Sequence, residues 1–346
     1  MSSSSARPGP RAHAHAHPTP SGPGTPTYRS GSSSDGRPHD RAGALLVLGA
    51  ATLWGTTGTA ASFAPAAVSP LSTGAATMGV GGLLTFLLAG RSALRVLRGG
   101  RRLLLWALLG GAAVAVYPLA FYSAMDRAGV AAGTVVTIGC SPVFAALLER
   151  VLVGVRLTLR WFAATLAAGT GCALLALTAS GGGARTGHDV PGGIALALLA
   201  GASYAAFACY GARIIRAGHS SRAAMGGLFG LGALVLLPVL AVTGGPLLSQ
   251  PRGLLVAAYL AVVPMCVAYV LFGAGLARIP AGTATTLTLF EPVVAAVLGV
   301  AVVGERLGAW AWTGTALVLL GLLVLTVRFR VRRRAGSGTG RIPQEG

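Results

Sequence analysis

Long apolar stretches alternate with short polar breaks along most of this chain, from residue 42 to residue 327. A stretch of about 20 apolar residues has the length that a helix needs to cross the hydrocarbon core of a bilayer. The pattern therefore predicts an all-α polytopic membrane protein with ten transmembrane helices. We expect these helices at residues 43–63, 72–90, 103–124, 131–153, 159–178, 192–212, 223–242, 253–275, 281–303 and 308–327.

The two ends of the chain lack this apolar pattern. Residues 1–41 are rich in Ser, Pro, Gly, Arg and His, and residues 328–346 form a short basic segment. Segments of this composition bury too little apolar surface to offset the entropy lost on ordering, so we predict two disordered tails. The first tail has no apolar segment ahead of a cleavage site, and we expect no signal peptide there. Its run of His13, His15 and His17 is interpreted as low-complexity sequence, with weak metal binding as the alternative.

The composition supports a membrane location. Only 10 % of the 346 residues are charged and 53 % are hydrophobic, whereas soluble domains carry about 25 % charged residues. All 27 basic residues are arginines, and the net charge of +19 would by itself suggest a nucleic-acid partner. The arginines, however, form short clusters between apolar stretches rather than a basic face with aromatic residues. We therefore expect no nucleic-acid binding and interpret the arginines as topology signals.

The arginine clusters also orient the predicted helices. If ten helices alternate in direction and the N-terminus is cytoplasmic, 20 of the 24 arginines between residues 29 and 334 fall on the cytoplasmic side and 4 fall outside. Loops rich in basic residues remain in the cytoplasm during insertion. The sequence thus predicts a multi-pass protein of the cell (inner) membrane with both termini in the cytoplasm.

The chain contains an internal repeat. Shifting the sequence by 150 residues aligns glycines, prolines and aromatic residues from the first predicted helix of each half to the last. The aligned pairs are Gly43 with Gly193, Trp54 with Tyr204, Pro142 with Pro292, Gly154 with Gly304 and Gly171 with Gly321; residues 132–134 align with 281–283 at a shift of 149. Each half, 42–180 and 191–327, then contains five helices, so the second half enters the membrane from the opposite side. Inverted repeats are typical of secondary transporters, whose solute site lies between the repeats near the middle of the membrane.

Three short motifs stand out in the two halves: Leu53-Trp54-Gly55, Phe290-Glu291-Pro292 and Val303-Gly304-Glu305-Arg306-Leu307. They resemble motifs of the EamA-type family of the drug/metabolite transporter superfamily. The resemblance covers residues 42–327 and implies transport of a metabolite such as an amino acid, a nucleoside-like compound or a drug. The family carries Glu-Pro and Gly-Glu-Arg in both halves, but the first half of this chain has Ser141-Pro142 and Gly154-Val155-Arg156. A symmetric mechanism with two carboxylates is therefore not expected.

One acidic residue, Glu291, lies deep inside a predicted helix. An ionisable group at the centre of a membrane helix costs at least about 2.5 kcal/mol and normally faces a cavity or a partner. We interpret Glu291 as a site for a substrate amine or a proton, with a structural hydrogen bond that fixes a helix kink as the alternative. The neighbouring Pro292 and its aligned counterpart Pro142 are predicted to break their helices, because proline removes a backbone hydrogen bond.

Hydroxyl side chains provide further candidates for a cavity. Thr134, Thr137 and Ser141 share one helix face through their i, i+3, i+7 spacing, and Thr288 lies close to Glu291 in helical angle. Such hydroxyls either line a cavity or bond to carbonyl groups of their own or a neighbouring helix, and both interpretations stay open here.

Four aromatic residues are predicted to line the same cavity, with anchoring at the membrane interface as the alternative. They are Trp54, Tyr117, Tyr204 and Tyr269. Trp54 and Tyr204 occupy aligned positions in the first helix of each half, which favours a role in the pore. From these residues and the family resemblance, we expect the first, third, fourth, sixth, eighth and ninth helices to surround the cavity. The fifth and tenth helices, with almost no polar residues at depth, are expected at the periphery.

The remaining polar residues suggest neither a catalytic nor a metal site. Glu149-Arg150 and Asp126-Arg127, near helix ends, are interpreted as local ion pairs or snorkelling side chains. The cysteines occur singly and without metal-ligand spacing, so no metal and no cofactor are expected. No nucleophile with a base and no pair of acids can be assembled within the apolar stretches, so we do not expect an enzyme.

The sequence therefore predicts a secondary transporter, working as an exporter, of a small metabolite such as an amino acid or a drug-like compound. Alternating access at the interface of the two repeats is the expected mechanism. The expected partners are the small-molecule substrate, the lipid bilayer, protons if transport is coupled to them, and a second copy of the chain in a homodimer. The alternatives are a non-transporting receptor or lipid scramblase of the same fold and, last, an intramembrane enzyme.

Overall fold

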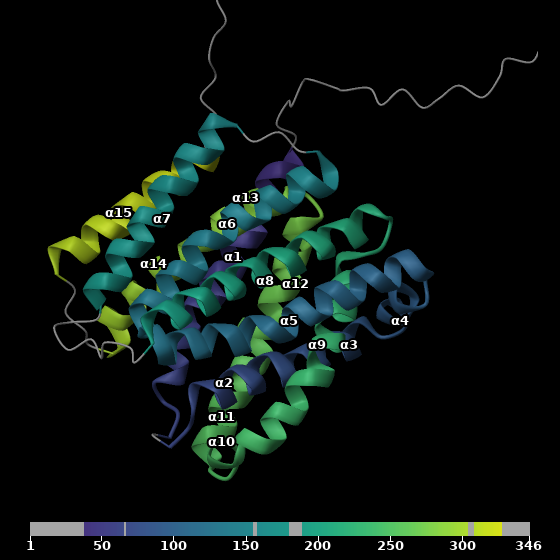
Figure 1. The fold of residues 1–346 in the computed structure, drawn as a ribbon, viewed down its shortest axis with the longest axis horizontal. Helices are drawn as coiled ribbons and strands as arrows, with labels where there is room; N and C mark the ends of the chain where they lie inside the picture. The colour runs from purple at the N-terminus through teal and green to yellow at the C-terminus, as the bar shows by residue number, and fades with distance from the viewer. Residues whose placement is uncertain (1–37, 66, 155–157, 180–188, 304–307, 327–346) are drawn as a thin grey trace, which may run out of the picture. The chain divides into compact units, whose positions relative to one another are not determined.

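The computed structural model describes residues 38–326 except residues 66, 155–157, 180–188 and 304–307. Within this part of the chain every regular element is helical (Figure 1). In chain order the elements are α1 (Pro38–Ala61), α2 (Pro70–Ala75), η1 (Ala76–Val80), α3 (Gly81–Ala89), α4 (Arg91–Leu97), α5 (Arg101–Ala128), α6 (Val130–Val153), α7 (Leu159–Ala179), α8 (Val190–Arg216), α9 (Ser221–Thr243), α10 (Gly245–Leu248), α11 (Pro251–Leu260), η2 (Ala261–Val267), α12 (Ala268–Leu276), α13 (Ala281–Leu287), η3 (Thr288–Phe290), α14 (Glu291–Leu298), η4 (Gly299–Val303) and α15 (Ala309–Thr326).

The apolar stretches predicted as helices are helical, but three of them change helix type along their length. The second predicted helix consists of α2, the π-helical turn η1 and α3, and the eighth consists of α11, the π-helical η2 and α12. The ninth passes from α13 through the 3₁₀ turn η3 to α14 and the π-helical η4. Proline lies inside η2 at Pro264 and at the second position of α14 at Pro292, and each proline removes one backbone donor.

Two short helices occupy segments that the sequence pattern leaves as loops. Gly90, with φ of 51°, turns the chain between α3 and α4, a backbone conformation that glycine adopts without strain. Helix α4 buries Ala93 and Val96 against α9 and leaves Arg95 exposed, so it is amphipathic but too short for a periodic signal. The other short helix, α10, contains one buried leucine, Leu247. Helix α1 begins at Pro38, earlier than the sequence pattern indicates.

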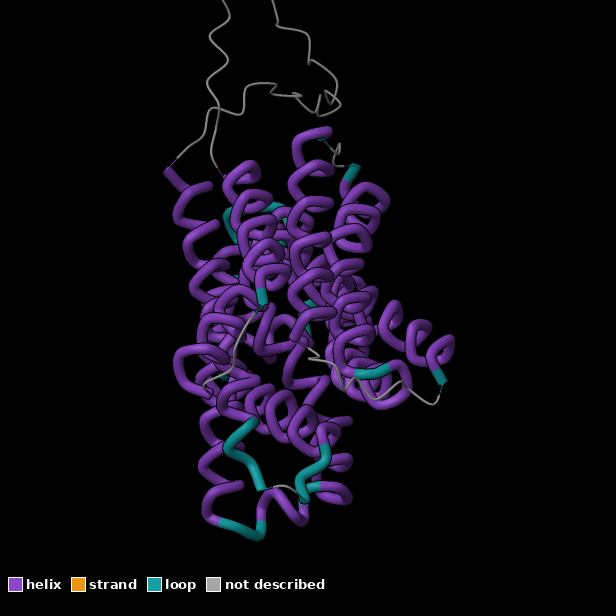
Figure 2. The backbone as a smooth tube through the Cα atoms, turned by 90° about the vertical axis from the view of Figure 1, so that its left-hand side faces the viewer, coloured by secondary structure: helices purple, strands orange, loops and turns teal. Residues whose placement is uncertain are grey.

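Eight helical segments of the described chain are long and apolar enough to cross a membrane, and a further apolar helix, Ala309–Leu325, is shorter. Figure 2 shows these helices packed side by side, with loops at both ends. Large apolar side chains such as Leu45, Leu88 and Leu234 are exposed on the outside of the bundle, as expected of side chains that face lipid. The described part of the chain is therefore all-helical, and the protein is a multi-pass membrane protein.

The two halves of the chain interlock in a symmetric pattern of helix contacts. Helix α1 packs on α12 and α14 of the second half, and its counterpart α8 packs on α5 and α6 of the first half. Helix α3 packs on its counterpart α9, and α7 packs on its counterpart α15. If each helix is replaced by its counterpart in the other half, every one of these contacts corresponds to a contact that is also observed. This symmetry places the centre of the bundle between the repeats.

Glycines that align in the repeat mark equivalent close approaches between helices. A Cβ added to Gly43 of α1 would lie 2.7 Å from Cβ of Arg278, and one added to Gly193 of α8 would lie 2.5 Å from the backbone nitrogen of Ala128. At both sites the first helix of one half crosses the end of the third helix of the other half. Only a residue without a side chain permits this approach, which explains the aligned pair in the sequence.

Gly226 and Gly230 of α9, which could also have formed a dimer surface, pack within the chain. A Cβ on Gly226 would lie 3.2 Å from the carbonyl oxygen of Thr85, and one on Gly230 would lie 2.5 Å from the ring of Phe86. Both neighbours belong to α3. The small-residue spacing therefore serves the contact between α3 and α9.

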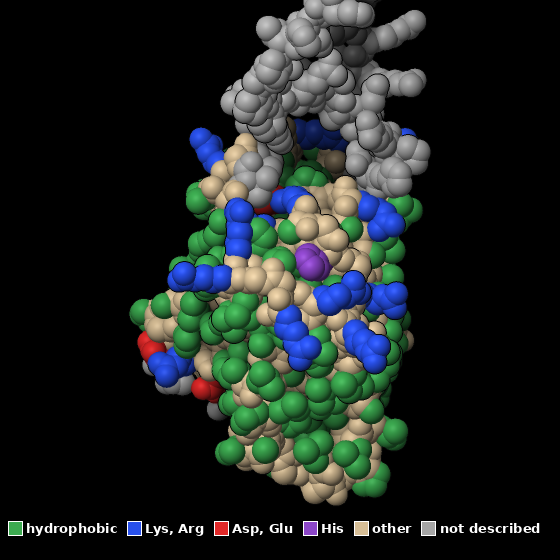
Figure 3. Space-filling model, turned by 90° about the vertical axis from the view of Figure 1, so that its right-hand side faces the viewer, with side chains coloured by type: hydrophobic (Ala, Val, Ile, Leu, Met, Phe, Trp, Pro, Cys, Tyr) green, Lys and Arg blue, Asp and Glu red, His purple; other side chains and the backbone are tan. Residues whose placement is uncertain are grey.

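The charged side chains are distributed unequally between the two ends of the bundle. We call the arginine end the end at which α3, α6, α8 and α12 finish and α5, α9 and α13 begin. The described arginines at this end, where α1 and α7 also begin, are Arg41, Arg91, Arg95, Arg98, Arg101, Arg102, Arg150, Arg160, Arg213, Arg216, Arg222 and Arg278. In Figure 3 basic side chains gather over the upper part and flank of the visible face, whereas its lowest part is mainly apolar.

Candidate functional site

A pocket with a cavity of about 110 Å³ lies between the two halves. Helices α1, α5 and α6, with the segment α2–η1, line it from the first half, and α8, η2, α12 and α14 line it from the second half. The predicted site residues Trp54, Tyr117, Tyr204, Tyr269 and Glu291 are all in this lining. The cavity exceeds the space that one water molecule requires.

Aromatic rings from both halves form the wall of the pocket. The ring centroid of Trp54 lies 4.8 Å from that of Tyr269 and 6.4 Å from that of Tyr204, its aligned counterpart in the repeat. Tyr117 approaches Tyr204 at 5.7 Å. These distances are typical of tilted and edge-to-face aromatic pairs, which hold large rings in defined orientations.

The aromatic cluster closes the pocket toward the arginine end. Phe207 and Phe272 lie one turn beyond Tyr204 and Tyr269 in that direction, and both are fully buried. The centroid of Phe207 lies 4.9 Å from that of Tyr204, and the centroid of Phe272 lies 5.4 Å from that of Trp54. Other lining residues, such as Thr57, Gly74 and Tyr122, lie near the opposite ends of their helices. The pocket is therefore closed on the arginine side and extends toward the opposite end.

Glu291 projects into this pocket from the first residue of α14. The 3₁₀ turn η3 directly precedes it and Pro292 directly follows it, so the helix changes type where the carboxylate enters the pocket. The structure records no hydrogen bond or ion pair for this carboxylate within the described residues. A carboxylate without a protein partner is available to a solute or a proton, whereas the kink-fixing alternative requires a hydrogen bond.

Gly55 places Glu291 next to Trp54. A Cβ on Gly55 would lie 2.6 Å from Cβ of Val294 and 2.9 Å from the carbonyl oxygen of Glu291. Helices α1 and α14 thus touch backbone to backbone at this point. The Leu53-Trp54-Gly55 motif combines an aromatic wall residue with the glycine that brings the carboxylate to it.

Trp54 also has an indole N–H without a partner. The side chain is 7 % exposed, and its Nε1 is one of two buried side-chain polar atoms of the described chain that lack a hydrogen bond, the other being Ser72 Oγ. A buried donor without a partner costs free energy unless a ligand or water accepts from it. Trp54 is therefore suited to donate to an acceptor group of a bound solute.

The predicted hydroxyl stripe of α6 faces helix α8 rather than the pocket. Thr137 Oγ1 donates to the carbonyl oxygen of Ala197 at 3.1 Å, and Ser141 Oγ donates to the carbonyl oxygen of Thr137 at 2.6 Å. Thr134 is half-buried one turn earlier and is not in the pocket lining. From the same helix it is Ile138 that lines the pocket. The structure thus assigns the hydroxyls of Thr137 and Ser141 to helix packing, the second of the two interpretations left open by the sequence.

Thr288 lies behind the aromatic wall. Its hydroxyl donates to the carbonyl oxygen of Thr285 at 2.8 Å and accepts from the Tyr204 hydroxyl at 3.4 Å. Thr288 therefore orients Tyr204 from the other half of the protein without itself lining the pocket.

The two aligned prolines differ in their effect. Pro292 follows a 3₁₀ turn and opens α14, whereas α6 continues as an α-helix through Pro142. The first half also lacks a carboxylate before its proline, because Ser141 occupies that position. The pocket is consequently asymmetric in both backbone and charge.

Sequence reasoning missed several lining residues, among them Thr77, Met78, Pro264 and Met265. They lie on the π-helical segments η1 and η2, which face each other across the bundle. Such segments are frequent at functional sites because they widen the helix and free backbone groups. Pro264, inside an otherwise apolar stretch, is the one sequence signal that marks this wall.

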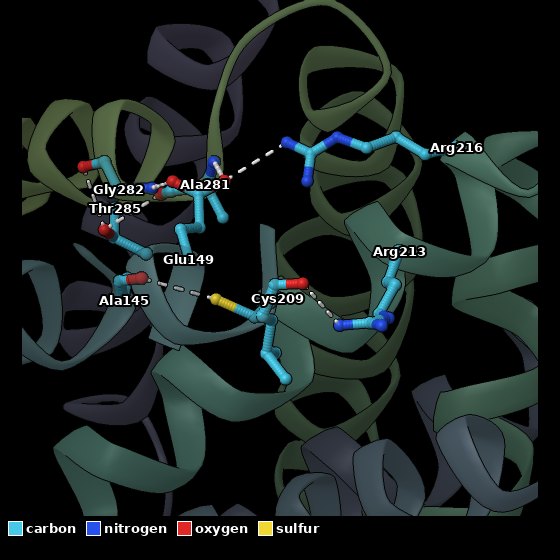
Figure 4. A network of polar contacts seen from close by, with 9 residues as sticks. Ala145, Glu149, Cys209, Arg213, Arg216, Ala281, Gly282 and Thr285 are labelled. Atoms are coloured by element: carbon cyan, nitrogen blue, oxygen red, sulfur yellow. Dashed lines mark hydrogen bonds and ion pairs between the residues drawn. The ribbon is translucent and has the colours of Figure 1, made fainter. Parts of the chain in front are cut away.

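The predicted ion pair between Glu149 and its neighbour Arg150 is wrong. The carboxylate of Glu149 pairs with Arg216 of α8 at 3.1 Å and accepts hydrogen bonds from the first residues of α13 (Figure 4). Asp126 and Arg127 do not pair with each other either, since Arg127 pairs with Asp189 at 3.0 Å. Adjacent residues on a helix point in different directions, so sequence neighbours rarely pair. Among the described side chains no group of three or more His, Cys, Asp or Glu residues could hold a metal ion.

The fold and the pocket define the class of the protein: a multi-pass membrane protein built from two related halves, with a pocket between them. The sequence pattern of the EamA-like transporter family matches residues 41–177 and again residues 191–327. The chain belongs to this family.

Two further similarities agree with this membership. Over 265 residues the chain is 36 % identical to the uncharacterized transporter YwfM of Bacillus subtilis (strain 168), which covers 76 % of this chain and 86 % of that protein. A solved crystal structure with 22 % sequence identity shares the fold, with a TM-score of 0.67, over 83 % of this chain and 96 % of that chain. The family and the name of this relative indicate a transporter rather than an enzyme.

Proposed function

We propose that the protein is a secondary transporter that exports a small organic solute carrying an amine or another cationic group. The observation that carries this proposal is the pocket between the two halves, which combines aromatic walls with a single carboxylate, Glu291. Trp54, Tyr117, Tyr204 and Tyr269 form the walls, and no arginine is among the lining residues.

The chemistry of the pocket favours a cation. Aromatic ring faces attract positively charged groups, most strongly when water is excluded. An amine bound by Glu291 would also receive a charge-assisted hydrogen bond. The unpaired indole N–H of Trp54 supplies one donor for an acceptor elsewhere on the solute. An amino acid or a drug-like amine matches both requirements.

The symmetric contacts support alternating access as the mechanism. In the conformation described above, the pocket is closed at the arginine end by Phe207 and Phe272. Each contact between the halves has an equivalent contact in which the two halves are interchanged. In a second conformation, each half could therefore adopt the arrangement that the other half has here, and the pocket would be closed at the opposite end. Movement between the two conformations would carry the solute across the membrane.

We further propose that the chain lies in the inner membrane of the cell and crosses it ten times. Both termini are then in the cytoplasm. The arginine end then faces the cytoplasm, in agreement with the retention of basic loops on that side. The pocket accordingly extends toward the outside. Helices α7 and α15, which pack on each other, lie outside the set that lines the pocket.

Metabolite profiling tests this function. Cells that overproduce the protein, cells with the Trp54→Ala variant and cells with empty vector are compared for solutes in the medium and in cell extracts. We expect the medium of the first culture alone to be enriched in a small set of amine-bearing compounds, at equal amounts of protein in the membrane. Identical profiles in the three cultures would contradict the proposal.

A further inference from the structure

A buried polar network ties the two halves together at the arginine end (Figure 4). Its centre is the carboxylate of Glu149 near the end of α6, whose side chain is 4 % exposed. Oε1 accepts from the backbone N–H of Ala281 at 2.8 Å, and Oε2 accepts from that of Gly282 at 2.9 Å. Arg216, at the end of α8, donates to Oε1 at 3.1 Å.

The chemistry of this contact makes it strong. The first N–H groups of a helix have no partner within the helix, and Ala281 and Gly282 are the first two residues of α13. A carboxylate satisfies both donors with charge-assisted hydrogen bonds and also interacts favourably with the helix dipole. Separating α6 from α13 would leave these buried groups without partners until water reached them.

The contact is placed where the two halves must separate. Helix α6 belongs to the first half and α13 to the second, and the aromatic closure of the pocket lies between this network and the cavity. Arg213 adds a second tie at the same end, because its guanidinium donates to the carbonyl oxygen of Leu152 at 3.0 Å. A solute can leave or enter at the arginine end only after α6 and α13 move apart.

The internal repeat places no carboxylate at the equivalent position of the opposite end. The position aligned with Glu149 is Gly299, and the residues aligned with Ala281 and Gly282 are Ala132 and Gly133. If the mirrored movement closed the opposite end, Gly299 would offer no carboxylate to the first residues of α6. Among the described residues, a buried carboxylate that ties the halves together therefore lies only at the arginine end. The pair of Arg127 with Asp189 joins α5 to the start of α8 at the opposite end, but both of its side chains are well exposed, 48 % and 38 %.

We propose that Glu149 is a latch that holds the arginine end closed and is released once in each transport cycle. Because the aligned position at the opposite end carries no carboxylate, we expect the protein to rest in the conformation shown in Figure 1, with the pocket extending toward the opposite end. This inference rests on the proposed alternating access, but its test does not require the solute.

The test measures thiol accessibility at two positions in purified protein in lipid nanodiscs, with the four native cysteines replaced by alanine. Thr285→Cys reports on the arginine end, since Thr285 is fully buried one turn after Gly282. Thr77→Cys reports on the pocket, which Thr77 lines. Each reporter is exposed to a water-soluble maleimide with and without Glu149→Gln, which keeps the shape of the side chain but loses its charge.

Loss of the charge weakens two hydrogen bonds and the pair with Arg216, so the population with an open arginine end should rise about tenfold. We expect maleimide labelling of Thr285→Cys to be about tenfold faster with Glu149→Gln, and labelling of Thr77→Cys to be slower. Arg216→Gln should shift both rates in the same directions but less. Arg150→Gln removes a neighbouring exposed arginine that makes no ion pair with Glu149 and should change neither rate.

Opposite changes at the two reporters in both Glu149→Gln and Arg216→Gln support the latch, because general unfolding would accelerate both. Unchanged rates, or faster labelling at both reporters, would overturn it. The transport proposal is judged separately. If the labelling rates change as expected but the protein transports no solute, the latch is supported and the transport function is contradicted. If the protein transports a solute but the labelling rates are unchanged, the transport function is supported and the latch is contradicted.

Discussion

The pocket depends on a few residues whose side chains have unequal roles. Trp54 supplies a ring face and an unpaired N–H, Tyr204 supplies a ring that Thr288 orients from the other half, and Glu291 supplies the charge. Gly55 has no side chain, and that absence lets the other groups meet. The proposed recognition of a cation rests on this combination rather than on any one of the residues.

Glu291→Gln should raise the KM for an amine-bearing solute about tenfold, because a neutral amide replaces a charge-assisted hydrogen bond by a weaker one. Glu291→Asp, which retains the charge, should lose less. If Glu291 also takes up a proton, the glutamine variant should lose the pH dependence of transport. Exchange rates in proteoliposomes at several solute concentrations and pH values measure all three effects. A near-normal KM for Glu291→Gln, with poor folding of Glu291→Ala, would instead indicate the structural role.

The sequence could predict the lining residues that carry a rare chemical group or align in the repeat, such as Glu291 and the pair Trp54 and Tyr204. The sequence could not show whether a hydroxyl side chain lines the pocket or packs against a neighbouring helix, because a threonine in a membrane helix finds hydrogen-bond partners in either place. Thr137 bonds to α8, and only the positions of both helices reveal this. The sequence could not predict the partner of Glu149 either, because Arg216 lies on a different helix and only the packing of the two helices brings them together.

At the level of helices, local changes of helix type shape the pocket. The turns η1, η2 and η3 lie in the segments from which Thr77, Met265 and Glu291 enter the lining. Helix location follows from apolar length alone, and the predicted stretches agree closely with the observed helices. A π-helical turn has no comparable sequence signal, because the same apolar residues are compatible with an α-helix.

The contact between α1 and α14 can be tested with two alanine substitutions on the same helix. Gly55→Ala adds a Cβ that would lie 2.6 Å from Val294, so α14 and Glu291 must move. We expect a loss of stability of about 1–3 kcal/mol, as for overpacked cores, and a clear loss of transport. Gly58→Ala is the control, because a Cβ there meets nothing within 4 Å. Thermal unfolding and transport of both variants are compared; equal behaviour would show that the close approach is not required.

The whole molecule combines a symmetric framework with an asymmetric charge distribution. The helix contacts exchange between halves, but Glu291 and Glu149 have no acidic counterparts in the other half, where Ser141 and Gly299 stand. The repeat in the sequence predicted the framework, because aligned glycines such as Gly43 and Gly193 mark equivalent helix crossings. We therefore propose that the similar helices provide the movement, and that the two acids, each present in one half only, provide its direction and its selectivity.

Reporter fusions test the proposed orientation of this framework. A fusion after Arg98, at the arginine end, should report a cytoplasmic location, and a fusion after Ser249, between α10 and α11, should report an external one. The reason is the excess of arginines at the end that contains Arg98. Reports from the same side for both fusions would rule out the ten-span arrangement with cytoplasmic termini.

The central claim is that a site between the two halves opens to each side of the membrane in turn. Counterflow tests it most directly: proteoliposomes loaded with the unlabelled solute identified by profiling are diluted into a trace of the labelled solute. A carrier exchanges one for the other, so we predict a transient accumulation of label above its equilibrium level, and none with Trp54→Ala. Label that only approaches equilibrium, or an accumulation that Trp54→Ala leaves intact, would contradict the account.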